Sequence, residues 1–176
     1  MGSKFKPGAF AMAALAVGLS VACQSARAQT ADELGSVVAK HGAWSMVCGQ
    51  PPGAPEKQCA IEQVDVAKDR AGISLSVIAF KTAGDKTPML SVIVPLDVLL
   101  PKGLTLFVDN KKIGRAYFMV CRVNGCEVQV KIDDDLMKTL SDGKQAYFSI
   151  YNSKDADGIA VPVDLNGFGD GFKALP

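Results

Sequence analysis

The sequence predicts a mainly β protein: an antiparallel β-sandwich or barrel-like single domain with one or two short helices. About eight or nine short segments rich in β-branched and aromatic residues lie between residues 44 and 163. Gly, Pro, Asn and Asp, which favour turns, separate these segments. Cysteines flank two of the turns. Hydrophobic residues make up 48% and charged residues 21% of the chain, a balance typical of a globular protein.

The first 28 residues have the pattern of a signal peptide. Lys4 and Lys6 give a positively charged N-terminal region, and an uncharged apolar run covers residues 8–22. The small residues Ala26 and Ala28 follow at the positions that a signal peptidase recognises. We therefore predict that residues 1–28 are removed by cleavage between Ala28 and Gln29. The protein is then expected in the periplasm, associated with the outer membrane, or secreted.

Two alternatives to this cleavage stay open. Cys23 follows a partial lipoprotein box, in which Ser20 stands where Leu is usual, and lipidation there would anchor the exported protein. A retained membrane anchor is less favoured, because the apolar run is short for crossing a bilayer. No later run is long and apolar enough, so we expect no transmembrane span in the mature chain.

Residues 29–43 are predicted to form a leader or a short helix ahead of a disulfide-stapled β-domain over residues 44–176. Thr30 and Glu33 have the spacing of a helix capping box, and Gly42 is a suitable helix stop.

Cleavage leaves four cysteines, which predict two disulfides in an oxidising compartment. Of the three possible connectivities we favour Cys48–Cys59 and Cys121–Cys126, because each pair lies on two β-like segments around a turn-rich loop. Neither pair has the C-x-x-C spacing typical of redox or zinc sites, so a structural role is expected. The second bridge needs Cys121 opposite Cys126, whereas a two-residue turn at Asn124-Gly125 would place Val128 there.

The expected strands share alternating or continuous apolar patterns. They cover residues 44–48, 59–64, 73–80, 89–94, 104–108, 116–121, 126–132, 145–151 and 159–163. The nearly continuous apolar run at 89–94 predicts a central strand, whereas Pro162 predicts an edge strand. A short helix is expected to begin at Asp133–Asp135 and to stop at Gly143, because acidic residues favour a helix N-terminus.

Charge and motifs argue against several classes of function. The chain has 19 basic and 18 acidic residues, so its bulk charge gives no indication of nucleic-acid binding. Its single histidine, His41, leaves little room for a histidine metal site or a catalytic triad. No nucleophile-elbow or phosphate-loop motif is present. We therefore expect no catalytic residue, no metal site and no cofactor.

Three weaker patterns have structural explanations. Ser153–Gly158 with Asp164 partly matches a calcium loop, but its strand-like flanks favour an ordinary hairpin turn. Asp133–Asp135 suits helix capping better than metal binding. Five aromatic residues are expected in the core or in cross-strand pairs more than in a ligand groove: Trp44, Phe107, Tyr117, Tyr147 and Tyr151.

An ordered set of features from Trp44 to Leu175 resembles the invasion-associated locus B family of exported alpha-proteobacterial proteins. Trp44 stands four residues before Cys48, and Cys59 opens the next strand. The segment 94–109, Cys121 with Gly125-Cys126, and the stretch 161–168 followed by Phe172 and Leu175 match in the same order. Asp97 is a departure, because the resemblance leads us to expect a small residue such as Gly there.

The resemblance implies an exported protein of the envelope or the medium, with members linked to host-cell invasion, and it brings no catalytic residue. Our leading expectation is a non-catalytic binding protein whose partner is an unknown macromolecule of the envelope or a host surface. The alternative is a periplasmic inhibitor or adaptor that uses the loop 49–55, which the first disulfide would hold. A third hypothesis is a hydrolase in which folding joins His41 to a Ser and an Asp.

Overall fold

The computed structural model describes residues 35–51, 53–68, 70, 72–153 and 157–176. The predicted signal peptide, its cleavage site at Ala28 and Gln29, Cys23 and the expected capping box lie outside the described residues. Part of the calcium-loop pattern, residues 154–156, also lies outside them.

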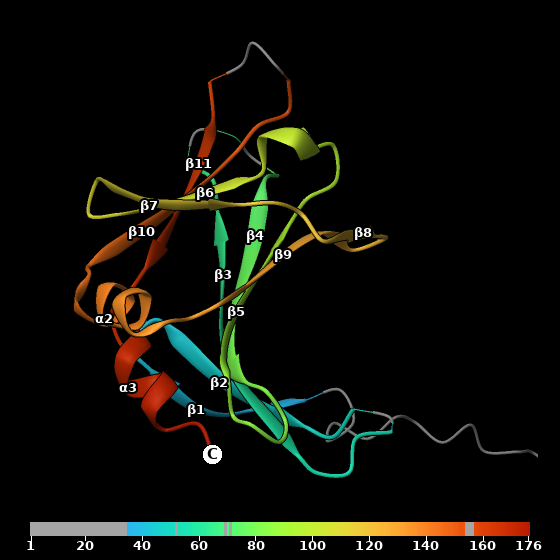
Figure 1. The fold of residues 1–176 in the computed structure, drawn as a ribbon, viewed down its shortest axis with the longest axis vertical. Coiled ribbons are helices and arrows are strands. Elements are labelled where there is room, and N and C mark those ends of the chain that lie inside the picture. Colours follow the sequence, from blue (N-terminus) through green and yellow to red (C-terminus); the bar gives the residue numbers. More distant parts are fainter. Residues whose placement is uncertain (1–34, 52, 69, 71, 154–156) are drawn as a thin grey trace, which may run out of the picture.

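The described strands form two antiparallel sheets (Figure 1). The seven-stranded sheet has the order β1 (Ser36–His41), β2 (Trp44–Gly49), β3 (Gln58–Val66), β4 (Ser74–Lys81), β5 (Pro88–Val94), β9 (Gly125–Lys131) and β8 (Val120–Arg122). The four-stranded sheet has the order β11 (Ile159–Asp164), β10 (Gln145–Ile150), β6 (Leu104–Val108) and β7 (Lys111–Ala116). Helices α2 (Asp134–Asp142) and α3 (Phe168–Lys173) and a 3-10 turn (Leu100–Lys102) complete the described elements. The predicted mainly β fold is confirmed, as two open sheets and not a closed barrel.

One hydrophobic core lies between the two sheets, because alternate side chains of each strand point inward. In β4 these are Leu75, Val77 and Ala79, all nearly inaccessible to solvent. β5 pairs with β4 on one side and β9 on the other, which confirms the central position predicted for residues 89–94. The prediction that Pro162 lies in an edge strand is also confirmed, since among the described strands β11 pairs only with β10.

The end of the core beside β1 and β2 is closed by α3. Phe168 packs edge-on against Trp44, with ring centroids 5.1 Å apart, and stacks on Phe172 at 6.1 Å. Gly42 and Gly167 both have positive φ, and a Cβ at either would clash with the backbone of the other's segment. This close approach brings the β1–β2 turn against the start of α3.

Residues 36–41 form strand β1 and not the expected leader or helix, so the folded domain begins before residue 44. The segment is short and partly exposed, but β2 supplies a hydrogen-bonding partner for its backbone. The expected strand 116–121 is also wrong: Ala116 ends β7, and only residues 120–122 form β8. β7 was missed because Lys111–Ala116 carries few apolar residues, as an exposed edge strand allows.

The predicted helix over 133–143 is confirmed as α2. The Asp133 carboxylate caps it by accepting a hydrogen bond from the Leu136 backbone N–H, at 2.8 Å. In contrast, α3 was not predicted, because two glycines in six residues disfavour a helix. Burial of Phe168 and Phe172 in the core stabilises it instead.

Candidate functional site

Both predicted disulfides are present. Cys48–Cys59 joins β2 to β3, and Cys121–Cys126 joins β8 to β9, each between directly opposite residues. Their Cα–Cα distances are 4.1 and 3.9 Å. Arg122 pairs with Gly125, so the two-residue turn is Val123-Asn124 and the register is the one that the second bridge requires.

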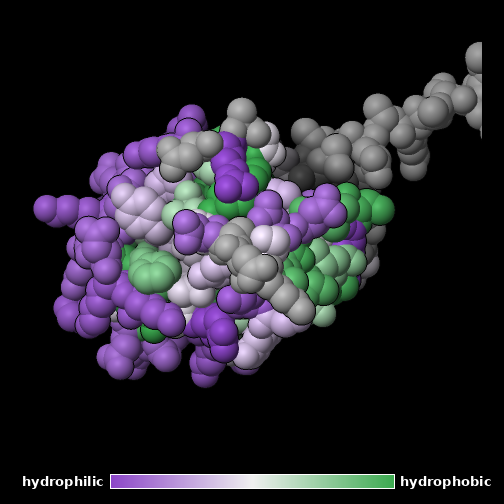
Figure 2. All heavy atoms as spheres, turned by 90° about the horizontal axis from the view of Figure 1, so that it is seen from above, coloured by the Kyte–Doolittle hydropathy of each residue, from purple (hydrophilic) through white to green (hydrophobic). Residues whose placement is uncertain are grey.

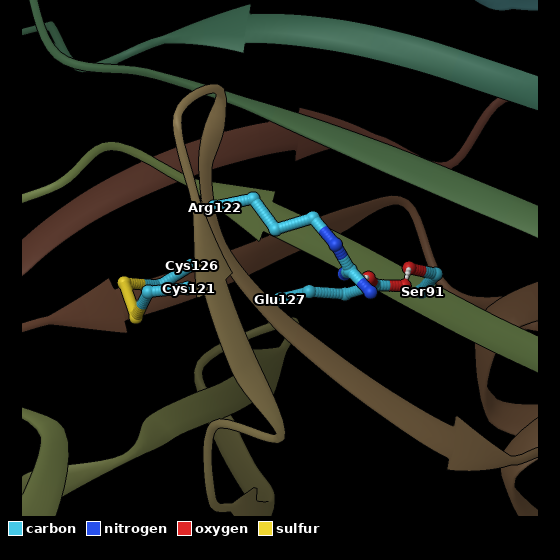
Figure 3. A network of polar contacts seen from close by, with 5 residues as sticks. All are labelled: Ser91, Cys121, Arg122, Cys126 and Glu127. Carbon is cyan, nitrogen blue, oxygen red and sulfur yellow. Dashed lines mark hydrogen bonds and ion pairs between the residues drawn. A yellow bond between two sulfur atoms is a disulfide. The ribbon is translucent and has the colours of Figure 1, made fainter.

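A polar network fixes the β8–β9 hairpin on β5 (Figure 3). The buried Ser91 hydroxyl donates to Oε1 of Glu127 at 2.7 Å, and Arg122 forms an ion pair with Oε2 of the same carboxylate at 3.7 Å. Since the partner of Ser91 is a carboxylate and not an imidazole, this arrangement positions strands and does not activate the hydroxyl as a nucleophile.

His41 lies against α3, where a Cβ on Gly171 would be 3.4 Å from its ring carbon Cγ. Its Nε2 atom is buried and has no hydrogen-bond partner among the described residues. The described part of the chain therefore gives no support to the hydrolase hypothesis, which needs this imidazole beside a Ser and an Asp.

In the C-terminal half of β3, the side-chain amide of Gln63 donates to Oδ1 of Asp65 at 3.0 Å. Burial raises the pKa of the Asp65 carboxyl, the Gln63 hydrogen bond acts in the opposite direction, and the charge of Asp164 raises it further. Within the described residues, no three His, Cys, Asp or Glu side chains gather as metal ligands would. Asp164 instead accepts a hydrogen bond from the Asn166 backbone N–H at 2.8 Å.

The five aromatic residues do not form one groove. Trp44 is in the core, Phe107 and Tyr147 are a cross-strand pair, and Tyr151 lies under the Lys102 ammonium group at 5.3 Å. Tyr117 differs from the others because 61% of it is exposed. The expected core and cross-strand roles are thus confirmed for three of them, and Tyr117 belongs to a surface feature.

That feature, which we call the hairpin surface, consists of Arg115, Tyr117, Met119 and Val123. Met119 is 63% and Val123 99% exposed, although both are large apolar residues. Arg115 donates to the Tyr117 hydroxyl at 2.9 Å, and its guanidinium lies 5.2 Å from the centre of the Tyr117 ring. At the end of the molecule shown in Figure 2, apolar residues gather on the side toward which β8 projects in Figure 1.

A second feature is an apolar cavity of about 350 Å³ between the inner faces of the two sheets. Its walls are buried side chains from four strands: Leu90, Val92, Leu104, Leu106, Val128 and Phe148. The exposed lining residues come from β7 and the start of α2, and they mark the opening: Gly114, Arg115, Asp133 and Asp135. We call this space the inter-sheet cavity; its volume is in the range of small-ligand sites.

Sequence reasoning missed both features. The inter-sheet cavity was missed because no local sequence pattern indicates that strands distant in the sequence enclose a space. The hairpin surface was missed because the predicted strand 116–121 placed Tyr117 and Met119 in a sheet. The lone glycine inside β7 was the one available signal for the cavity, because a strand-interior glycine often marks a close approach.

The fold and these features define a disulfide-tied protein of two open β-sheets, with an exposed apolar hairpin and an apolar cavity. Residues 44–176 match the family model for Invasion associated locus B (IalB) protein, and the chain belongs to this family. It is 28% identical over 144 residues to "Invasion protein B" of Bartonella bacilliformis, covering 80% of this chain and 75% of that protein. The crystal structure of invasion associated protein b from Bartonella henselae has the same fold, with a TM-score of 0.61 and 24% identity over 77% of this chain and 93% of that one.

The disulfides and the Invasion protein B relative indicate an extracytoplasmic protein. None of the helices among the described residues is both long enough and apolar enough to cross a membrane.

Proposed function

We propose that the chain is an exported, non-catalytic binding protein that holds a macromolecular partner at the hairpin surface. The observation that carries this proposal is the exposure of Val123, at the turn of the hairpin that the Cys121–Cys126 disulfide closes, and of Tyr117 and Met119, in the segment that leads into β8. Large apolar side chains that gather on a surface mark interaction sites.

The composition of the hairpin surface supports the same function. Aromatic residues, Met and Arg are enriched at protein–protein interfaces, and Tyr and Arg are frequent among the residues that dominate binding energy. The disulfide and the Arg122–Glu127 ion pair hold the hairpin in place before binding. Binding of a partner therefore costs little conformational entropy, because the hairpin is already ordered. Because the chain belongs to the invasion-associated locus B family, we expect the partner in the envelope or on a host cell.

The test places a photo-crosslinking amino acid at Val123 in the native bacterium. A matched control places it at Val64, an exposed valine on β3. We expect a discrete adduct from position 123 that position 64 does not give, and its loss in the double variant Tyr117→Ala/Met119→Ala with an unchanged unfolding midpoint. The same adducts from both positions, or loss of the adduct only together with unfolding, would refute the hairpin surface as the binding site.

The inhibitor or adaptor alternative assigns binding to the loop 49–55 instead. Within this loop, Gln50 donates through its side chain to the Ala54 carbonyl at 3.1 Å, and the Ala54 N–H donates to the Pro51 carbonyl at 2.9 Å. A crosslinker at Pro51 tests this alternative in the same experiment, since an adduct there and not at 123 favours it.

A further inference from the structure

The inter-sheet cavity points to a ligand that the proposed function does not include. We propose that it binds a single-chain amphiphile, with an aliphatic chain between the sheets and an uncharged polar head at the opening beside β7 and α2. The walls of the cavity come from the inner faces of the sheets and are separate from the hairpin surface, which shares only Arg115 with the opening.

The walls suit an aliphatic chain. Leucine and valine side chains from both sheets form most of them, and Phe148 is the only aromatic residue among the lining residues. A planar aromatic ligand would find one ring on which to stack, whereas a flexible chain contacts branched aliphatic groups on all sides. The cavity is open to solvent, so a chain can enter without unfolding of the core.

Gly114 is the strongest indication that the inter-sheet cavity binds a ligand. Glycine weakens a strand interior, so a conformational or packing reason is expected for it. The φ of Gly114 lies outside the left-handed region, and a Cβ there would meet no atom within 4 Å. The neighbouring irregularity between Leu106 and Phe107 is a β-bulge, but a bulge requires glycine only where the backbone is left-handed. Neither a left-handed backbone nor close packing therefore explains this glycine. Because Gly114 has no side chain, the opening of the inter-sheet cavity stays free.

The charges at the opening favour an uncharged head. Arg115 lies on one side, and Asp133 and Asp135 lie on the other. The Asp133 carboxylate caps the helix and Arg115 donates to the Tyr117 hydroxyl, and neither Asp135 nor Arg115 forms an ion pair with a described residue. A charged head of either sign would meet a like charge at the opening. A hydroxyl head can accept a hydrogen bond from Arg115 and donate one to Asp135, and an ester head can accept from Arg115 and remain solvated on the Asp135 side.

The test titrates n-decanol into the full folded domain and follows methyl resonances by NMR. We expect saturable shifts at Val92, Leu106 and Val128, and none at Val64 and Val66 on the opposite face of the seven-stranded sheet. Gly114→Leu fills the opening and should weaken binding roughly tenfold or more, with no fall in the unfolding midpoint. Ala160→Leu is the matched control, because it adds the same side chain at an exposed position of β11 and should leave binding unchanged.

Several outcomes would overturn the proposal. They are the absence of shifts up to the solubility limit of n-decanol, shifts confined to Val64 and Val66, or equal binding by Gly114→Leu and the unaltered protein. If Gly114→Leu does not fold, Ala116→Leu adds volume at another lining position and decides the question by the same measurement.

Discussion

The indole N–H of Trp44 donates a hydrogen bond of 3.0 Å to the backbone carbonyl of Asp164, 120 residues further along the chain. Trp44 begins β2 in the seven-stranded sheet, and Asp164 ends β11 in the four-stranded sheet. One side chain thus connects the two sheets while its ring packs on Phe168. The tryptophan that first marks the family resemblance is therefore a structural residue.

Trp44→Phe should reduce the free energy of unfolding by about 2–3 kcal/mol, because it leaves the Asp164 carbonyl without its donor and creates a space beside Phe168. Urea denaturation measures the loss. Tyr117→Phe is the control, since it removes an exposed hydrogen bond to Arg115 and should change stability very little. Equal losses in the two variants would contradict the role assigned to Trp44.

Removing the disulfides should have unequal effects. Replacing Cys48 and Cys59 by Ala is expected to cost about 3 kcal/mol, and replacing Cys121 and Cys126 about 2 kcal/mol, because the first bridge closes the longer loop, with a separation of 11 residues against 5. Denaturation of each double variant checks this order. A larger loss from the second pair would show that the short bridge does more than constrain the unfolded chain.

Asp97→Gly should stabilise the protein by about 0.5–1 kcal/mol. Asp97 has a φ of +66°, a conformation that costs an ordinary residue energy and that glycine adopts freely. The same position is where the family resemblance led us to expect a small residue. The unfolding midpoint measures the gain, and Asp97→Ala, which keeps the steric cost, should show none.

Asp65→Asn should be more stable than the unaltered protein near neutral pH. Because burial raises the pKa of Asp65 in the folded state, its ionised form opposes folding, and stability from this group increases as pH falls toward and below the raised pKa. Asparagine removes the charge and can still accept from Gln63. The advantage of the variant should therefore shrink on acidification, as denaturation at pH 7 and near pH 4 would measure. An advantage independent of pH would refute the titration of Asp65 as its cause.

Protease digestion distinguishes the proposed locations. If the partner is on a host cell, protease added to intact bacteria should digest the protein. Protection that ends when the outer membrane is opened would place it in the periplasm and favour the inhibitor or adaptor. A known periplasmic protein measured in the same cells controls for leakage.

Patterns that depend on neighbouring residues were predictable. The alternation in β4 and β9, the Asp133 cap of α2 and the edge position of Pro162 follow from side-chain spacing, capping chemistry and the missing N–H of proline. The disulfide pairing followed from cysteines around turns. Strands β1 and β7 were not predictable in this way, because they have little apolar pattern of their own and are stabilised by pairing with the neighbouring strands β2 and β6. Helix α3 was not predictable because the Trp44 ring, distant in the sequence, stabilises it.

The sequence by itself determined the β class, the covalent framework and the family, because each depends on residue types and their order along the chain. Only the tertiary structure decided which surfaces and spaces the proposed partner and ligand could use. The exposure of Tyr117, Met119 and Val123 depends on which faces other elements cover. The cavity beside Gly114 depends on how closely two sheets approach, and that distance is set by packing between residues far apart in the sequence.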